Sequence, residues 1–151
     1  VGNKGLVIEK VDGPSHLKVV EEFGYEMYLH CGAIRKVLLA YQTPAFIDQY
    51  FKTIIVNDQA FHHVRPEDLK AELKKIRRDG YAITHGEYVN DAIGIGAPIF
   101  NSDGELAGSI GIIAPEIRIE TDDYLITLRE LVRRHAAGLS ADMGYEARRI
   151  V

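Results

Sequence analysis

Four side chains of this chain have the chemical types that metal sites and thiol enzymes use. They are His30, Cys31, His85 and Glu87. Imidazole, thiolate and carboxylate groups in one place suit zinc or a similar ion. No short ligand spacing such as HxxxH or CxxC accompanies them, so these four residues are only weak metal candidates. We therefore predict no metal site and no other cofactor.

Cys31 is the single cysteine of the chain, and it could act as a nucleophile only with a suitable base. Such a base must lie within hydrogen-bond reach of the thiol, and a third group must orient it. His30 is adjacent in sequence, but adjacent residues on a helix point about 100° apart. A buried cysteine that acts as a small hydrophobe is the simpler interpretation. We expect no enzyme activity, and a thiol- or metal-dependent enzyme is the alternative.

A glycine-rich hairpin is the other feature that could hold a ligand. Two strands flank the turn at Asn101–Gly104, and alternate residues of a strand share a face. Gly94 and Gly96 therefore share one face, and Ser109 and Gly111 share it too if Phe100 pairs with Glu105. This nearly bare face either leaves room for a ligand or lets a helix approach closely. The opposite face should pack on helices through Ile93, Ile95, Ile99, Ile110 and Ile112.

The helix that must position this site runs through Ile34, Val37, Leu38 and Tyr41, which follow helical spacing. It should start near His30–Gly32, where free backbone N–H groups and the helix dipole suit an anion such as a ligand carboxylate. The spacing and turn residues predict these further elements: strands Leu6–Val11 and Leu17–Val20 as a hairpin, helices over 44–53 and from Pro66 to the Gly80 cap, a strand over 81–89 with a bulge at Gly86, and a last helix capped by Thr121.

Glu87 falls on the predicted strand that leads into the hairpin. Its carboxylate could bind a ligand hydroxyl or amine, or it could be an ordinary exposed glutamate. Hairpin strands are antiparallel, and together with these helices they give an α+β domain with helices covering one face of the sheet.

The bulk composition fits a single soluble domain. The chain has 151 residues, 46% hydrophobic and 26% charged, with a net charge of −4, which gives no reason to expect nucleic-acid binding by charge. The basic cluster near Arg77 is best interpreted as a solvated helix end. No apolar run is long enough to span a membrane and no signal peptide is visible. A single cysteine fits a reducing compartment, so we expect a cytoplasmic protein with no membrane contact.

Several segments together resemble one known family. Leu29–Ala40 (LHCGAIRKVLLA) is similar to the LHxxxxGKxxLA helix start of the effector-binding domain of IclR-family transcriptional regulators, with Arg35 in place of the glycine. Leu73–Tyr81 is similar to the family's EL-x-x-IRxxGY segment, and Ser109–Pro115 resembles the strand that usually ends in Ser-Gly-Pro. Further residues fall at the spacings of the family signature: Gly80, Glu87, Ile95, Gly96, Ile99, Phe100 and Asn101.

This resemblance covers residues 1–145, with 146–151 as a tail. It implies a GAF-like α+β fold: an antiparallel sheet with helices packed on it and a ligand pocket on one side, near the helix that starts at Gly32. It implies a small organic effector, a homodimer or homotetramer, and DNA binding only through a winged helix-turn-helix domain that precedes this one and is absent from this chain. An oligomerisation module with a filled pocket is a third possibility.

The resemblance also carries over the pocket, with departures from the family pattern. Thr84 stands at an acidic position, Gly94 at a cysteine, serine or alanine position, and Gly111 and Ile113 at two serine positions. The pocket should therefore be larger and less polar, with an effector larger or less polar than pyruvate. The full set of candidate ligand-binding residues is His30, Cys31, Gly32, Ala33, Ile34, Thr84, His85, Glu87, Gly94, Ser109, Gly111 and Ile113.

Overall fold

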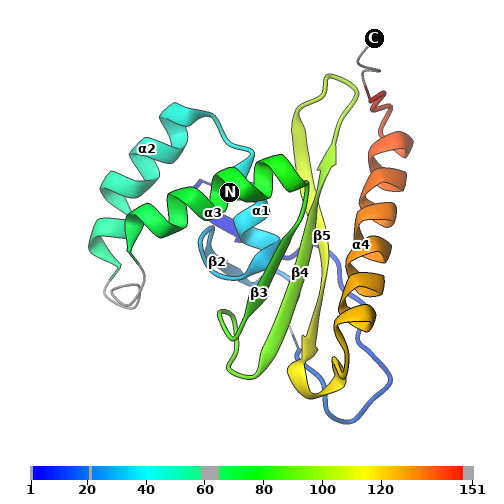
Figure 1. The fold of residues 1–151 in the computed structure, drawn as a ribbon. Helices are drawn as coiled ribbons and strands as arrows, with labels where there is room; N and C mark the ends of the chain where they lie inside the picture. The colour runs from blue at the N-terminus through cyan, green and yellow to red at the C-terminus, as the bar shows by residue number, and fades with distance from the viewer. Residues whose placement is uncertain (1, 21, 59–64, 148–151) are drawn as a thin grey trace.

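The computed structural model describes residues 2–20, 22–58 and 65–147 of the chain (Figure 1). Three strands form an antiparallel sheet in the order β3-β4-β5, and two short strands, β1 and β2, pair separately. The elements are β1 (Lys4–Leu6), β2 (Glu26–Tyr28), α1 (Ala33–Ala40), α2 (Pro44–Thr53), the short 3-10 helix η1 (Ile55–Asn57), α3 (Pro66–Asp79), β3 (Ala82–His85), β4 (Ala92–Phe100), β5 (Leu106–Pro115), the 3-10 helix η3 (Glu116–Arg118) and α4 (Asp122–Asp142).

Helices lie on both faces of the three-stranded sheet. Helices α1, α2 and α3 are on one side, and α4 runs along the other side (Figure 1). The α+β class is therefore confirmed, but the expectation that helices cover only one face is wrong. The error has a simple cause: a sheet that is apolar on one face and glycine-rich on the other can bury both faces.

Strands β4 and β5 form the expected hairpin, with a register that differs from the prediction. A bulge between Ile99 and Phe100 makes Phe100 pair with Leu106, and Gly96 pairs with Gly111 instead of Ser109. A bulge inserts an unpaired residue and so shifts the ladder. Because the net shift is two residues, every side chain keeps its predicted face.

Helix α1 covers the glycine face closely. A methyl group on Gly96 would lie 2.8 Å from the Cα atom of Ile34, and one on Gly111 would lie 2.5 Å from Cγ1 of the same isoleucine. Glycine at these two positions lets the helix approach the strands. At Gly96 and Gly111 the structure thus shows the alternative in which a helix packs on the glycines.

The isoleucine face packs on α4, as predicted. Ile93, Ile95 and Ala97 form one buried cluster with Val132 and Ala136 of α4. The hydroxyl of Thr121 accepts a hydrogen bond from the N–H of Tyr124 at 3.1 Å and caps the helix. On the same helix Leu139 is 40% exposed and His135 is exposed. The buried stripe continues instead through Ser140.

Helices α2 and α3 begin and end where the capping residues predicted. The hydroxyl of Thr43 accepts a hydrogen bond from the N–H of Phe46, and Pro44 is the first residue of α2. Gly80 ends α3 with a φ of 79°, which glycine adopts without strain. Both helices contribute to a second core beside α1, formed by Leu29, Ala33, Val37, Leu39, Ala40, Tyr50, Phe51, Ile55, Leu69, Leu73, Ile76 and Ala82.

Two strand predictions are wrong. The N-terminal hairpin is absent among the described residues, because Lys4–Leu6 pairs with Glu26–Tyr28 and neither 8–11 nor 17–20 is in a strand. Strand β3 ends at His85, because Gly86 takes a φ of 67° and turns the chain. Residues 86–91 therefore form a loop between β3 and β4, and Glu87 lies on this loop instead of on a strand.

Candidate functional site

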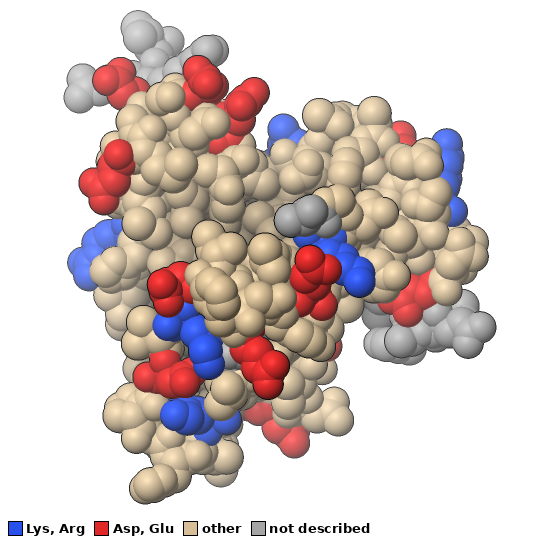
Figure 2. All heavy atoms as spheres, turned by 180° about the vertical axis from the view of Figure 1, so that it is seen from behind, with Lys and Arg blue, Asp and Glu red and all other residues tan. Residues whose placement is uncertain are grey.

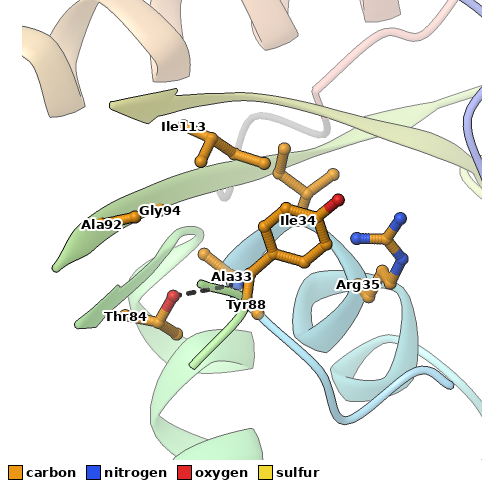
Figure 3. Close-up of a pocket in the computed structure, with 9 residues that line it drawn as sticks. Ala33, Ile34, Arg35, Thr84, Tyr88, Ala92, Gly94 and Ile113 are labelled. Carbon is orange, nitrogen blue, oxygen red and sulfur yellow. Dashed lines mark hydrogen bonds between the residues drawn. The ribbon is translucent and has the colours of Figure 1, made fainter. Parts of the chain in front are cut away.

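The first turn of α1 lies against the middle of the sheet. Gly32 caps the helix with a φ of 85°, and its carbonyl accepts the first helical hydrogen bond, from Lys36 N–H at 2.9 Å. The N–H of Ala33 donates to the hydroxyl of Thr84 on β3 at 3.1 Å (Figure 3). One of the backbone donors expected to face a ligand is thus already bonded to the protein, and this bond fixes the helix start against the sheet.

A small cavity lies between this helix start and β4. The volume open to the centre of a water-sized sphere is about 10 Å³, which is about the room for one water molecule. The cavity is therefore closed to any organic ligand, and the expectation of a larger pocket is wrong for this conformation. Its lining residues are Gly32, Ala33, Ile34, Arg35, Thr84, Tyr88, Ala92, Gly94 and Ile113 (Figure 3).

The structure brings half of the predicted ligand-binding residues to this cavity. Those that line it are Gly32, Ala33, Ile34, Thr84, Gly94 and Ile113. The sequence reasoning missed Arg35, Tyr88 and Ala92. A signal existed for Arg35, because it stands where the resembled family has glycine. None existed for Tyr88, since its place depends on where β3 ends.

His30 does not line the cavity and instead joins α1 to its neighbours. Its side chain is buried, with Nδ1 2.7 Å from the hydroxyl of Tyr50 and Nε2 2.7 Å from a carboxylate oxygen of Asp58. Burial lowers the pKa of His30, although hydrogen bonding to Asp58 opposes the shift. Burial also raises the pKa of Tyr50. A neutral imidazole then accepts from the Tyr50 O–H and donates from Nε2 to Asp58, which fixes the chain just before α1.

Glu87 is also held by the protein. The buried ammonium group of Lys36 pairs with Glu87 and, at 2.9 Å, with Glu72 of α3. Both carboxylates are partly exposed, with about a third of each side chain open to solvent. Glu87 does not line the cavity, so its position gives no support to the predicted ligand role. Its carboxylate joins the 86–91 loop to Lys36 of α1, which also pairs with Glu72 of α3.

Three of the weak metal candidates have bonding partners of their own. His30 bonds to Tyr50 and Asp58, Glu87 pairs with Lys36, and His85 lies 3.2 Å from Glu116 near an open cleft beside the start of α4. Within 2–20, 22–58 and 65–147, no group of three or more histidine, cysteine or acidic side chains is arranged to hold a metal ion.

Cys31 is half-buried, and burial raises the pKa of its thiol. A raised pKa leaves less thiolate at neutral pH, so the environment opposes nucleophilic chemistry. The remaining two predicted residues serve packing: the hydroxyl of Ser109 donates to the carbonyl of Ile34 at 2.8 Å, and Gly111 contacts the side chain of Ile34.

The face shown in Figure 2 gives no sign of a nucleic-acid site. Basic side chains lie among acidic ones on the face shown in Figure 2, without a continuous basic patch there. Several side chains of the cluster near Arg77 are bonded within the domain. Arg78 and Lys75 pair with Asp79, and Arg77 donates to the carbonyl groups of Ala40 and Gln42 at the end of α1. Within the described part of the chain, no helix has the length and apolar character needed to cross a bilayer.

The helix-covered sheet and the internal cavity define an α+β domain of the GAF-like type. A model of the family described as bacterial transcriptional regulator IclR C-terminal matches residues 1–141. The chain therefore belongs to the IclR C-terminal family of bacterial transcriptional regulators. The resemblance seen in the sequence is confirmed.

Named relatives and solved structures agree with this assignment. The chain is 30% identical over 145 residues to the HTH-type transcriptional regulator KipR of Bacillus subtilis. The aligned region covers 95% of this chain and 58% of KipR. The crystal structure of the IclR protein of Thermotoga maritima has a TM-score of 0.84 at 27% identity, covering 96% of this chain and 59% of that one. A C-terminal domain of a Vibrio cholerae regulator has a TM-score of 0.75 at 27% identity, covering 92% and 80%. The chain thus spans about three fifths of KipR and of the Thermotoga protein.

Proposed function

We propose that this chain is the effector-sensing domain of a transcriptional regulator and that its effector binds in the cavity between α1 and β4. The observation that carries the proposal is the position of this cavity. It lies where the start of a helix, with its positive dipole end, meets a strand that has glycine in place of side chains. An organic anion suits such a place.

The lining supports an effector with an apolar part. Gly94, Ile113 and Ala92 offer no polar side chain, and the hydroxyl of Thr84 is already bonded to Ala33. We therefore propose a small organic acid less polar than pyruvate. The cavity is too small in this conformation to support an effector larger than pyruvate.

The sensor would act on DNA by linkage. An effector changes operator affinity only through its different affinities for two arrangements of the regulator. Coupling of this kind is typically about 1–3 kcal/mol, or roughly 5–150-fold in affinity. In this proposal the chain self-associates as a dimer or tetramer, residues 1–145 form the domain, and a separate N-terminal winged helix-turn-helix domain makes the DNA contacts.

Calorimetric titration of the chain with pyruvate and with isobutyrate tests this proposal. We expect isobutyrate to bind more tightly than pyruvate, because the cavity lining is apolar. Micromolar binding of pyruvate would contradict the proposed polarity. Failure of both acids to bind, together with failure of benzoate, would contradict the effector site itself.

Two glycine substitutions locate the binding. A side chain on Gly94 would enter the cavity, since an added Cβ lies 3.0 Å from the Thr84 hydroxyl and 3.3 Å from the Ala33 methyl. Gly94→Leu should therefore abolish isobutyrate binding. Gly108→Leu is the matched control, because an added Cβ on Gly108 of β5 has no neighbour within 4 Å among the described residues. If Gly94→Leu bound the acid as wild type does, the site would lie elsewhere.

Sedimentation of the same variants separates a sensor from a pure oligomerisation module. A ligand cavity that is filled by Gly94→Leu leaves self-association intact, whereas a packed interface at this position would lose it. The enzyme alternative has less support: the relatives are named as transcriptional regulators, and burial raises the pKa of Cys31. A catalytic turnover that the wild-type chain shows and the Cys31→Ala variant lacks would support the enzyme alternative.

A further inference from the structure

The cavity must open before any organic acid can bind, because it has room for about one water molecule. Most of its lining cannot move alone. Ala33, Ile34 and Arg35 belong to α1, which packs directly on the glycine face, and the residues of β3, β4 and β5 are held by ladder hydrogen bonds. Of the described lining residues, only Gly32 at the helix cap and Tyr88 lie outside regular elements.

Tyr88 is carried by the 86–91 loop, and its side chain covers the helix start. A methyl group on Gly32 would lie 3.4 Å from the Cβ atom of Tyr88, and the ring lies beside Ile34 and Arg35 (Figure 3). The loop has turns at both ends, with a φ of 67° at Gly86 and 59° at Asp91. A positive φ is uncommon outside glycine, and such positions occur where the chain reverses direction.

Two consecutive residues of this loop are held by two consecutive residues of α1. Glu87 pairs with Lys36, and the guanidinium of Arg35 lies 5.5 Å from the centre of the Tyr88 ring. The second contact has the geometry of a cation–π interaction. These two contacts close the loop over the cavity, and both involve groups that a bound anion would affect.

We infer that Tyr88 is the gate of the effector cavity and that Arg35 selects a carboxylate there. This inference rests on the proposed function and adds how the site opens and which charge it accepts. Arg35 is the one cationic side chain among the described lining residues, and it is 4% exposed. A guanidinium offers a fork of N–H donors that matches a carboxylate. A ligand that enters with its carboxylate toward Arg35 would accept from the N–H donors at the edge of the guanidinium, and Tyr88 must move aside for the ligand to reach them.

The gate is tested without any effector, because the chain contains no tryptophan. Tyr88→Trp places a single fluorophore on the gate, and acrylamide quenching of its emission reports how far the loop is closed. Adding Glu87→Gln removes the ion pair to Lys36 and should raise the quenching constant severalfold. Glu72→Gln is the matched control, since it removes the other carboxylate on Lys36 without touching the loop. Equal quenching in the Glu87→Gln and Glu72→Gln variants would overturn the gate.

Charge selection is tested by calorimetry with isobutyrate and isobutyramide, which have the same shape and differ in charge. The wild-type chain should prefer the acid over the amide by roughly ten- to a hundredfold, the ratio that a hydrogen bond to a charged group provides. Arg35→Gln should remove this preference, and Arg35→Lys should keep part of it. Circular dichroism shows whether each variant folds, and Arg35→Met, which keeps an unbranched side chain without the charge, replaces Arg35→Gln if that variant does not fold.

The outcomes separate this inference from the proposed function. If the acid and the amide bind the wild-type chain equally well, or if Arg35→Gln keeps the full preference, Arg35 does not select the ligand while the effector site stands. If no acid binds at all, the proposed function falls and takes the role of Arg35 with it. The gate is then still decided by the quenching experiment.

Discussion

The two faces of the three-stranded sheet are packed in different ways. On one face, isoleucine and alanine side chains of the strands fill the space against α4. On the other face, the strands present glycine, and the backbone of α1 itself comes within contact distance. Among the described residues, α4 buries one polar side chain, that of Ser140, whereas the α1 face buries Arg35, Lys36, His30 and Thr84.

The two faces of the sheet should contribute differently to the stability and to the function of the domain. Apolar burial against α4 contributes stability in proportion to area and is indifferent to direction. Buried charged and polar groups on the α1 face contribute less net stability, because their desolvation costs offset their pairing. They hold α1, the cavity and the 86–91 loop in a defined arrangement instead. Substitutions on the two faces should therefore separate effects on unfolding from effects on binding.

The largest effect should follow from Ile95→Ala on the α4 face. Ile95 is 1% exposed, and removing a buried isoleucine side chain costs about 2–5 kcal/mol through lost burial and a residual cavity. Chemical denaturation measures this loss. Binding of isobutyrate to the folded fraction should be unchanged, and a large change in affinity would contradict the separation of the faces.

A smaller effect should follow from Gly96→Ala on the α1 face. The added methyl group would lie 2.8 Å from the Cα atom of Ile34 and 3.0 Å from its nitrogen, and overpacking of this kind costs roughly 1–3 kcal/mol. Because it displaces the start of α1, it should also weaken isobutyrate binding. Gly108→Ala serves as the control, since its methyl group would meet open space. Equal stability of the two variants would show that α1 does not press on the glycines.

The smallest effect should be a pH dependence that originates at His30. Burial holds the pKa of the folded-state imidazole below its ordinary value of 6.5, so the unfolded chain binds a proton first as the pH falls. The contribution of His30 to the free energy of unfolding is therefore fully present above about pH 6.5. It falls as the pH decreases from there through the folded-state pKa.

Urea denaturation at pH 7.5 and at lower pH measures this slope. His30→Gln should be less stable than wild type at neutral pH, but its stability should depend less on pH in this range. His85→Gln is the control, because the His85 side chain is exposed. An unchanged slope in His30→Gln would place the titration elsewhere.

Much of this arrangement could be read from the sequence, because local rules decide it. Pro44, Gly80 and Thr121 fix helix ends through their own backbone and side-chain chemistry, and the glycine and isoleucine faces follow from a period of two. What failed depends on a backbone conformation that the residue type permits without requiring it. The φ of Gly86 ends β3 early and turns residues 86–91 into a loop, which moved Glu87 off a strand and brought Tyr88 to the cavity.

The candidate site was predictable only in part. Ala33 could be placed by the helix start and Gly94 by the period of two, whereas Thr84 came from the family resemblance. The partners of His30 and Glu87 could not, because Tyr50, Asp58 and Lys36 come from other segments. Sequence spacing gives the positions of such side chains but does not identify their hydrogen-bond partners. His30 and Glu87 suited a ligand by residue type, and the structure shows both bonded to other residues of the protein.

Amide hydrogen–deuterium exchange with and without saturating isobutyrate tests the central claim most directly. It compares both faces of the sheet in one experiment. We predict slower exchange in residues 32–36 and 84–94 when the acid binds, and no change in α4 at Asp122–Asp142. Protection confined to α4, or none in 32–36 and 84–94 under conditions where calorimetry shows binding, would contradict an effector site between α1 and β4.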